Sequence, residues 1–419
     1  MYSDCFEVIS RPAGRSLSEA TSGSSPVVTR SLRAMGIFSV VAFATVQFGG
    51  NVPTPLYHLY QEQWALSPLM LTTIFAVYPL AILVALLLVG SLSDHTGRRP
   101  VIAGGLLLSA AAIPLFIEAS SGFQLIIARV VQGLATGTAA SALGAAILDA
   151  DAVEGPLING LTAFMGVGLG ALGSSVLVSY APAPTRLVYW VMLAAFLLLA
   201  PVIAWMPETV SVRPGALASL RPHVAIPSQA GRAFLLVSPV NVAGWALSGF
   251  YLSLMPSLFR VTTGIDSPLV GGTVVASLSF SGAAAAFGWH RQAATRILLF
   301  GAVALAAGVP VTLLGVHAQS VLLLAIGTLV AGAGFGAGFF GAGRTILPLA
   351  APHQRAGLLS AFYVESYLAF SLPAIAVGIL VPLIGLTAST YVFGGVVIVL
   401  ATASLLATLL SVRNTQVVD

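Results

Sequence analysis

The ten residues GSLSDHTGRR, Gly90 to Arg99, decide the fold that we expect for this chain. Long apolar segments flank them on both sides, in a sequence of which only 7% is charged. Asp94, Arg98 and Arg99 lie where one apolar segment stops and the next begins, which leaves room only for a tight turn between two membrane helices. Gly90 and Gly97 suit such a turn, because glycine permits close helix contact and a positive φ.

The composition excludes a soluble domain. The 419 residues are 58% hydrophobic with a mean hydropathy of +0.99, whereas about a quarter of a soluble domain is charged. A membrane helix needs roughly 20 apolar residues, so the chain has room for about a dozen spans in a lipid bilayer. All 17 basic residues are Arg, which excludes lysine chemistry. Their dispersal between the apolar segments argues against a nucleic-acid partner.

The hydropathy pattern predicts an all-α integral membrane protein with twelve transmembrane helices in two six-helix halves. Pro53 and Pro55 are expected to break the first helix near its periplasmic end. The first half takes residues 34 to 206, with spans at 34–57, 67–91, 99–118, 122–148, 156–180 and 186–206. The second half takes residues 233 to 411, with spans at 233–258, 268–290, 296–316, 319–344, 355–381 and 387–411.

Three polar stretches complete the predicted organisation. Residues 1 to 33 are rich in Ser and predict a disordered cytoplasmic tail. Residues 207 to 232 form a cytoplasmic linker between the halves, and residues 412 to 419 form a second cytoplasmic tail.

The distribution of Arg predicts the orientation. Fourteen Arg fall in loops on one side, Arg186 and Arg260 fall on the other, and Arg129 lies inside a span. Cytoplasmic loops carry the excess of positive charge, so both termini are expected in the cytoplasm. High Gly, Ala and Arg content without Lys suggests a GC-rich bacterial genome, so we expect the protein in a bacterial cytoplasmic (inner) membrane.

A shift of 198 residues indicates an internal repeat. It aligns Gly90 with Gly288 and Arg98 with Arg296, while Asp94 falls on Gln292. Two six-span halves joined by a linker are typical of transporters, whose substrate site lies between the halves near the bilayer midplane.

Two motifs carry a resemblance to the major facilitator superfamily, which covers residues 34 to 411. GSLSDHTGRR resembles the superfamily's loop signature, matched by Gly90, Asp94, Gly97, Arg98 and Arg99. RVVQGLATG resembles a second signature in the fourth span, matched by Arg129, Gln132, Gly133 and Gly137, and the Pro-Glu-Thr after the sixth span is also similar. The layout is most like the twelve-helix drug:proton antiporters. Ala171 replaces a proline expected in their fifth span, and the first span carries no acidic residue, so lipophilic cations are a less obvious substrate.

The resemblance implies a conformational switch at the loop signature. Asp94 is expected to contact the start of the eleventh span, near Pro352 to Arg355, and to join the halves in one state only. A carboxylate beside a helix N-terminus is favoured by ~0.3 to 1 kcal/mol. The alternative is that Asp94, Arg98 and Arg99 are merely charges of a short loop that set the orientation of the chain in the membrane.

Arg129 and Glu365 are the charges placed within spans. A guanidinium there costs at least ~2.5 kcal/mol, so Arg129 should face a wet cavity or a partner, unless it extends to the periplasmic surface. The resemblance implies a role in proton coupling or substrate binding. Glu365 lies roughly 15 Å into the eleventh span, where burial favours the neutral carboxyl. We expect Glu365 to bind a proton or a cation; the alternative is a neutral carboxyl hydrogen-bonded between helices.

Further polar residues are candidates for the substrate cavity, which in this superfamily is lined by the first, fourth, seventh and tenth spans. Hydrogen bonds between helices explain them equally well. The candidates are Gln47, Asn51, Arg129, Gln132, Asn241, Trp245 and Glu365.

The function expected from these features is secondary active transport by alternating access. No phosphate-binding GxxxxGK[ST] loop and no clustered metal ligands are present in the sequence, so we expect no cofactor, no metal and no enzyme activity. Proton-coupled export of small amphipathic molecules is the first hypothesis, with Arg129, Glu365 and Asp94 as coupling candidates. An importer or facilitator of an organic acid, sugar or amino acid is the alternative, and a membrane sensor or membrane enzyme is a third. The expected partners are a small-molecule substrate and protons, with the protein as a monomer.

Overall fold

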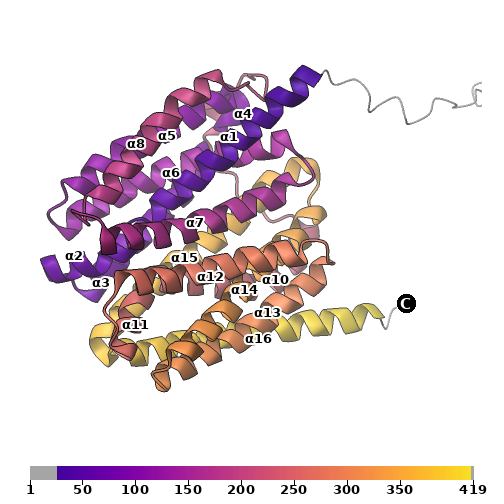
Figure 1. The fold of residues 1–419 in the computed structure, drawn as a ribbon. Coiled ribbons are helices and arrows are strands. Elements are labelled where there is room, and N and C mark those ends of the chain that lie inside the picture. Colours follow the sequence, from indigo (N-terminus) through magenta and orange to yellow (C-terminus); the bar gives the residue numbers. More distant parts are fainter. Residues whose placement is uncertain (1–25, 417–419) are drawn as a thin grey trace, which may run out of the picture.

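The computed structural model describes residues 26–416, which form α-helices, short 3-10 helices and turns, with no strand in that range. Twelve of its helices are long and apolar enough to cross a membrane, which confirms the expected fold class (Figure 1). In the first half these are α1 (Pro26–Asn51), α3 (Pro68–Val89), α5 (Arg98–Ile117), α6 (Gly122–Ala150), α7 (Gly155–Tyr180) and α8 (Leu187–Val202). In the second half they are α10 (Ser228–Ser253), α12 (Pro268–Trp289), α13 (Ala294–His317), α14 (Val321–Ile346), α15 (Arg355–Ile384) and α16 (Leu386–Gln416).

Local chemistry explains where several helices begin. Ser67, Ser121 and Ser320 each precede a helix, and their hydroxyls accept the backbone N–H three residues on. Serine at this position satisfies an N–H group that the helix itself leaves unpaired. Pro68 and Pro268 stand at the first helical position, where a missing N–H is harmless.

Some boundaries differ from those expected. α1 begins at Pro26 instead of residue 34, and residues 1–25 of the expected tail lie outside the described part of the chain. α10 begins at Ser228, directly after Pro227, so the expected linker loses its last residues to a helix. The linker also contains the short helix α9 (Ala216–Ser219). α16 continues to Gln416, and residues 417–419 lie outside the described part.

Two short helices were not anticipated. α1 ends at Asn51, as the prolines after it predict, and is followed by η1 (Thr54–Leu56) and α2 (Tyr57–Trp64). In the second half α10 ends at Ser253, and α11 (Met255–Thr263) follows it. The 198-residue shift of the internal repeat places the start of α2 on the start of α11, so the repeat extends to these helices.

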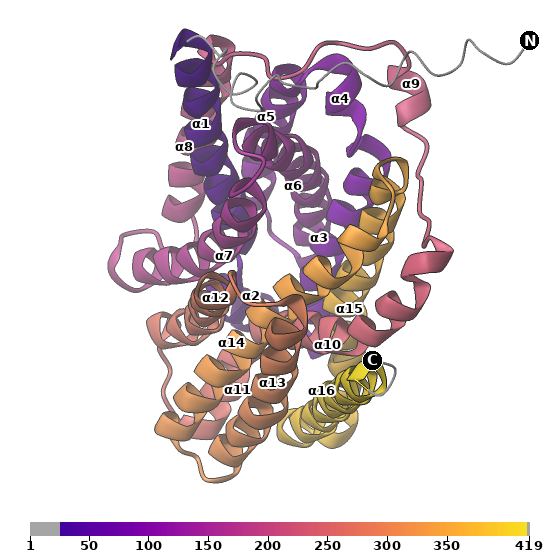
Figure 2. The same ribbon diagram turned by 90° about the vertical axis from the view of Figure 1, so that its right-hand side faces the viewer.

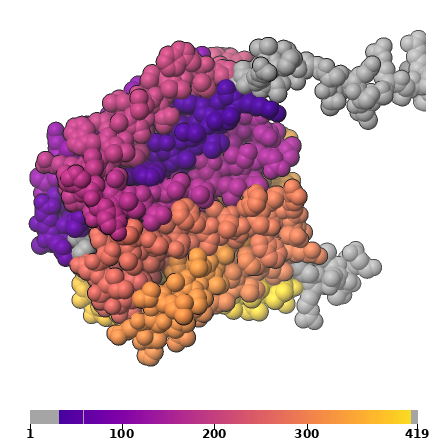
Figure 3. All heavy atoms as spheres, in the orientation of Figure 1, coloured from indigo at the N-terminus to yellow at the C-terminus, as the bar shows by residue number. Residues whose placement is uncertain are grey.

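The two halves pack side by side, with indigo to magenta helices in one and orange to yellow helices in the other (Figures 1 and 3). α7 lies along α12, and α3 lies along α15 (Figures 1 and 2). Phe75 meets Phe370 edge to face at 5.2 Å between ring centroids. At Gly272 an added Cβ would lie 1.8 Å from the Ser175 hydroxyl, so these backbones approach closely only because residue 272 is glycine.

The two ends of the bundle differ. We call the end where α1 begins, α16 ends and the linker runs the linker end, and the opposite end, with α2 and α11, the far end (Figure 1). At the far end the Arg260 guanidinium of α11 pairs with the Glu62 carboxylate of α2 at 3.1 Å. These residues are separated by 198 positions, which is the repeat shift, so equivalent positions of the two halves meet. The halves are therefore in direct contact at the far end.

Candidate functional site

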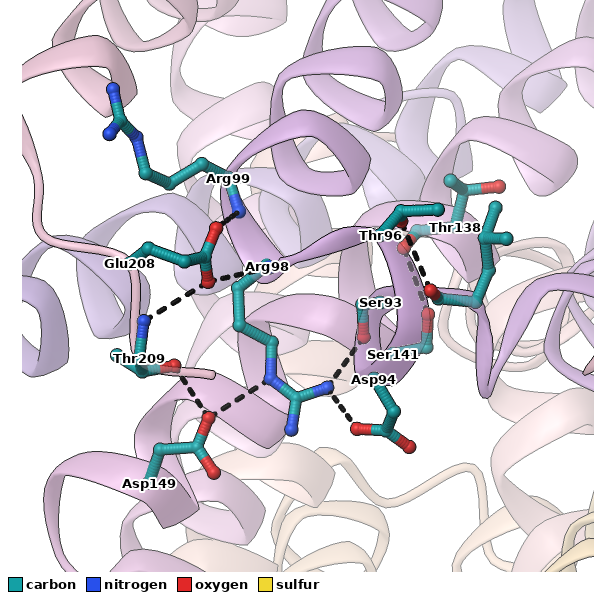
Figure 4. A network of polar contacts seen from close by, with 11 residues as sticks. Ser93, Asp94, Thr96, Arg98, Arg99, Thr138, Ser141, Asp149, Glu208 and Thr209 are labelled. Atoms are coloured by element: carbon teal, nitrogen blue, oxygen red, sulfur yellow. Dashed lines mark hydrogen bonds and ion pairs between the residues drawn. The ribbon is translucent and has the colours of Figure 1, made fainter. Parts of the chain in front are cut away.

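The loop signature forms a polar network at the linker end (Figure 4). It includes the short helix α4 (Leu92–Thr96), which lies between α3 and α5. Gly97 has φ +96°, a left-handed conformation that favours glycine. An added Cβ there would also lie 2.6 Å from Glu208 Oε2. The positive φ expected in this loop thus occurs at Gly97, whereas Gly90 ends α3 with φ −55°.

Glu208, the acid of the Pro-Glu-Thr sequence, binds the start of α5. Its Oε1 accepts the backbone N–H of Arg98 at 2.8 Å, and its Oε2 accepts that of Arg99 at 3.1 Å. These are unpaired N–H groups of the first turn of α5, where a carboxylate also interacts favourably with the helix dipole. Arg99 in turn donates from its guanidinium to the Ala204 carbonyl. Glu208 therefore ties the start of the linker to the start of α5.

The Arg98 side chain is the centre of the network. It donates to Asp149 Oδ2 at 2.9 Å, to the Ser93 hydroxyl at 2.7 Å and to Asp94 Oδ1 at 2.5 Å. Asp149 at the end of α6 also accepts the Thr209 hydroxyl at 2.6 Å. Asp149 was not among the expected site residues, although an acid at the end of an apolar span can be recognised in the sequence. Arg98 is therefore held by carboxylates within one half.

Among the described residues, Asp94 makes no hydrogen bond or ion pair with α15. Its side chain is 53% exposed, and its recorded ion-pair partner is Arg98. Together with His95, Arg98, Val210 and Arg213 it lines a cavity of about 340 Å³ beneath the linker. The linker lies over α4, since Arg213 donates its N–H to the His95 carbonyl and Ser91 donates to the Ser219 carbonyl. The expected contact between Asp94 and the start of α15 stays a prediction for another state.

Arg129 occupies an enclosed site in the first half. Only 1% of it is exposed, so it does not extend to the surface. Its guanidinium donates to the Gly50 carbonyl at 2.8 Å, to Gln132 Oε1 at 2.7 Å and to the Tyr57 hydroxyl at 2.6 Å. The Tyr78 ring lies 4.4 Å from the guanidinium carbon. These neutral partners hold two of the guanidinium nitrogens, as an intramembrane Arg requires, while the buried Nε has no hydrogen-bond partner among the described residues.

The Arg129 site fixes the end of α1 onto α6. Gln132 adds a hydrogen bond from its amide to the Gly49 carbonyl at 2.9 Å. Burial raises the pKa of Tyr57, which lies outside the spans, and the nearby Arg129 charge offsets only part of that rise. The Tyr57 hydroxyl is therefore neutral and can accept the Arg129 hydrogen bond. Tyr57 was not among the expected residues because its helix was not.

The second half brings two expected residues together. Asn241 of α10 donates from its amide to Glu365 Oε2 of α15 at 2.7 Å and to the Ser366 hydroxyl at 3.0 Å. Asn241 is 1% exposed and its Oδ1 has no hydrogen-bond partner among the described residues, whereas Glu365 is half-buried. Glu365 thus has the partner on another helix that the predicted alternative, a carboxyl hydrogen-bonded between helices, requires. The carboxyl is also partly exposed.

Aromatic rings surround the third expected residue of this half, Trp245, which lies one helical turn from Asn241. The rings of Phe335, Phe339, Tyr367 and Phe370 have centroids 5.3 to 5.8 Å from that of Trp245. Its Nε1 has no recorded acceptor. The rings of the cluster belong to α10, α14 and α15, so no single stretch of sequence predicts it.

Gln47 and Asn51 do not join the Glu365 site through any recorded contact. Asn51 donates to the Gln47 carbonyl of its own helix at 2.7 Å. The expected cavity residues therefore divide into an Arg129 group in the first half and a Glu365 group in the second.

Sequence comparison assigns the family. Residues 37–364 match the family model described as the Major Facilitator Superfamily. The chain belongs to the Major Facilitator Superfamily. This membership indicates a membrane transporter, not an enzyme, and a small-molecule substrate. No curated protein sequence matches this superfamily member.

Solved structures share the superfamily fold with this chain. A mutant of the nucleoside transporter NupG aligns with a TM-score of 0.68 and 13% identity, covering 89% of this chain and 99% of its own. The human organic anion transporter MFSD10 (TETRAN) aligns with a TM-score of 0.62 and 15% identity, covering 91% and 100%. At these identities the similarity is one of fold.

Proposed function

We propose that this superfamily member is a secondary active transporter that exports small amphipathic molecules in exchange for protons. Glu365 carries the proposal, because it is a half-buried carboxyl inside a span with a hydrogen-bonding partner on the neighbouring helix. Intramembrane acids of this kind mark proton and substrate pathways. The driving force is the proton gradient, with no cofactor.

Asn241 suits both protonation states of Glu365. Its amide N–H group donates to the carboxylate. A protonated carboxyl can donate instead, and the Asn241 Oδ1, which has no partner among the described residues, is an acceptor within the same side chain. The same Asn241 amide can therefore hydrogen-bond with the ionised and with the protonated carboxyl.

Alternating access is supported by the asymmetry of the contacts. The halves meet through Glu62 and Arg260 at the far end, while Asp94 at the linker end is exposed. We assign the linker end to the cytoplasm of a bacterial inner membrane, with both termini there and the protein as a monomer. In this assignment Asp94 binds the start of α15 when the cytoplasmic ends approach. Arg129 contributes by fixing the end of α1, so that the first half moves as one body.

The test is growth of an efflux-deficient bacterium on a panel of antibiotics, dyes and organic acids. Cells express the wild type, Asp94→Asn, Glu365→Gln or the control Glu118→Gln, whose carboxyl is exposed after α5. We expect resistance to at least one amphipathic compound with the wild type and the control, and its loss in the other two variants at equal expression. Sensitisation by the wild type would instead indicate import of that compound and overturn export.

A further inference from the structure

We propose that the Glu365 site binds organic cations that carry N–H donors, namely protonated amines with an apolar or aromatic body. This inference rests on the proposed transport function and names its substrate class. It is carried by the Glu365 carboxylate, the unpaired Asn241 Oδ1 and the aromatic rings around Trp245.

The charges within the spans differ in accessibility. Arg129, the cation deepest in the first half, is enclosed and already bonded to three neutral groups. Glu365 is half-buried, and one of its oxygens bonds to Asn241. Of these two charges, the negative one is therefore the more accessible. This favours a cation over an anion.

The hydrogen-bonding groups at the site also favour a donor. Only 1% of the Asn241 surface is exposed, yet its Oδ1 accepts no hydrogen bond from the described residues. Buried polar atoms are normally paired, because leaving one unpaired costs about 1–3 kcal/mol. An ammonium group with two or more N–H bonds can donate to this oxygen and to the carboxylate together, which a quaternary ammonium cannot do.

The rings next to the carboxyl suit the body of such a molecule. Trp245, Phe339 and Tyr367 are each half-buried. The ring centroid of Trp245 lies 5.4 Å from that of Phe339 and 5.8 Å from that of Tyr367. Aromatic faces attract ammonium groups and pack against apolar or aromatic surfaces. Phe339 further stacks on Phe362 at 5.5 Å, one turn before Glu365 on the same face of α15. Through the buried Phe362, the aromatic cluster thus extends to the turn of α15 that precedes Glu365.

The test measures binding to the purified full-length protein in neutral detergent by isothermal titration, without any gradient, against a protein-free micelle blank. The probes are 3-phenylpropylammonium, its N-trimethyl analogue, 3-phenylpropan-1-ol and 3-phenylpropionate, with a second set built on naphthalene. The variants are Glu365→Gln, Glu365→Asp, Trp245→Leu and the control Glu118→Gln, each checked for an unchanged unfolding temperature.

We expect the primary ammonium to bind best in at least one set and the carboxylate not to bind. Glu365→Gln should weaken ammonium binding at least about tenfold, since the half-buried ionic partner of the ammonium is lost, while Glu365→Asp and Glu118→Gln retain binding. Trp245→Leu should weaken the binding of both cations, and the N-trimethyl analogue should bind less well than the primary amine. Tighter binding of the carboxylate, no binding of any amine at millimolar concentration, or amine binding unchanged in Glu365→Gln would each overturn the substrate class.

These outcomes are separable from the transport function. Amine binding without resistance or proton exchange would retain the substrate class and reject the exporter. Proton-coupled export of anions would retain the exporter and reject the substrate class.

Discussion

Single residues at the linker end and at α1 are held by networks that a substitution should disturb specifically. Gly97 combines a left-handed backbone with the approach of Glu208, and Arg129 binds three groups, which lie on α1, on α2 and on its own helix α6. The signature residues around Gly97 were recognisable in the sequence, because the loop is short and its charges are rare. Asp149, Tyr57 and the partners of Arg98 were not, since spacing along one helix says nothing of which helix lies opposite.

Gly97→Ala should destabilise the protein by about 1–2 kcal/mol from the left-handed backbone alone, and further by displacing Glu208 from the start of α5. The measurement is the thermal unfolding midpoint in detergent. Gly104→Ala is the matched control on α5, because an added Cβ there meets nothing within 4 Å. An equal midpoint for Gly97→Ala and Gly104→Ala would contradict the role assigned to Gly97.

Arg129→Lys keeps the charge but cannot reach Gly50, Gln132 and Tyr57 together, because an ammonium is a point donor and not a planar fork. We expect a loss of about 3 kcal/mol or more, from charged hydrogen bonds worth ~1.5–3 kcal/mol each. The measurement is again thermal unfolding, with Arg186→Lys in a loop as the control. Retained stability in Arg129→Lys would show that charge alone is sufficient.

Helices were the elements best predicted from sequence, because a run of apolar residues that spans a bilayer has few alternatives. α2 and α11 were missed for two reasons. At eight and nine residues they are too short to be predicted as spans, and each follows closely after a span in the sequence. Hydropathy also does not predict which helices pack against each other. α13 and α14 pack most closely where glycine allows backbone contact, as at Gly334, whose added Cβ would lie 2.5 Å from the Leu305 nitrogen.

Gly334→Val should therefore force α13 and α14 apart, at a cost of about 1–3 kcal/mol or more for overpacking. The measurements are the yield of monodisperse protein and its unfolding midpoint. Gly395→Val on α16 is the control, because an added Cβ there meets no neighbour within 4 Å. If both variants behaved alike, the close packing of α13 on α14 would be wrong.

The whole molecule is two equivalent halves whose relative position sets which side is open. Twelve spans and the division into halves followed from the sequence, but the contact state did not, because the same residues must fit at least two states. Asn241 and Glu365 were separate candidates that only the packing of α10 on α15 joined. Glu62 and Arg260, which sit at equivalent positions, hold the far end together here.

Reversing one of these charges should shift the protein toward a state open at the far end. Glu62→Arg places two like charges together, and the double variant Glu62→Arg with Arg260→Glu should restore the contact. An exposed pair is worth up to about 1 kcal/mol, which corresponds to roughly a fivefold change in population. Distances between spin labels on α2 and α11 measure it, and equal distance distributions in all three proteins would contradict a role for this pair.

The central claim is that Glu365 couples substrate movement to protons, and proteoliposomes test it most directly. Purified wild type and Glu365→Gln are compared for substrate accumulation driven by an imposed pH gradient and for substrate exchange without a gradient. We predict that the wild type performs both, whereas Glu365→Gln loses gradient-driven accumulation and retains exchange at substrate concentrations high enough to saturate its weakened site. Accumulation by Glu365→Gln that still follows the pH gradient would contradict the account.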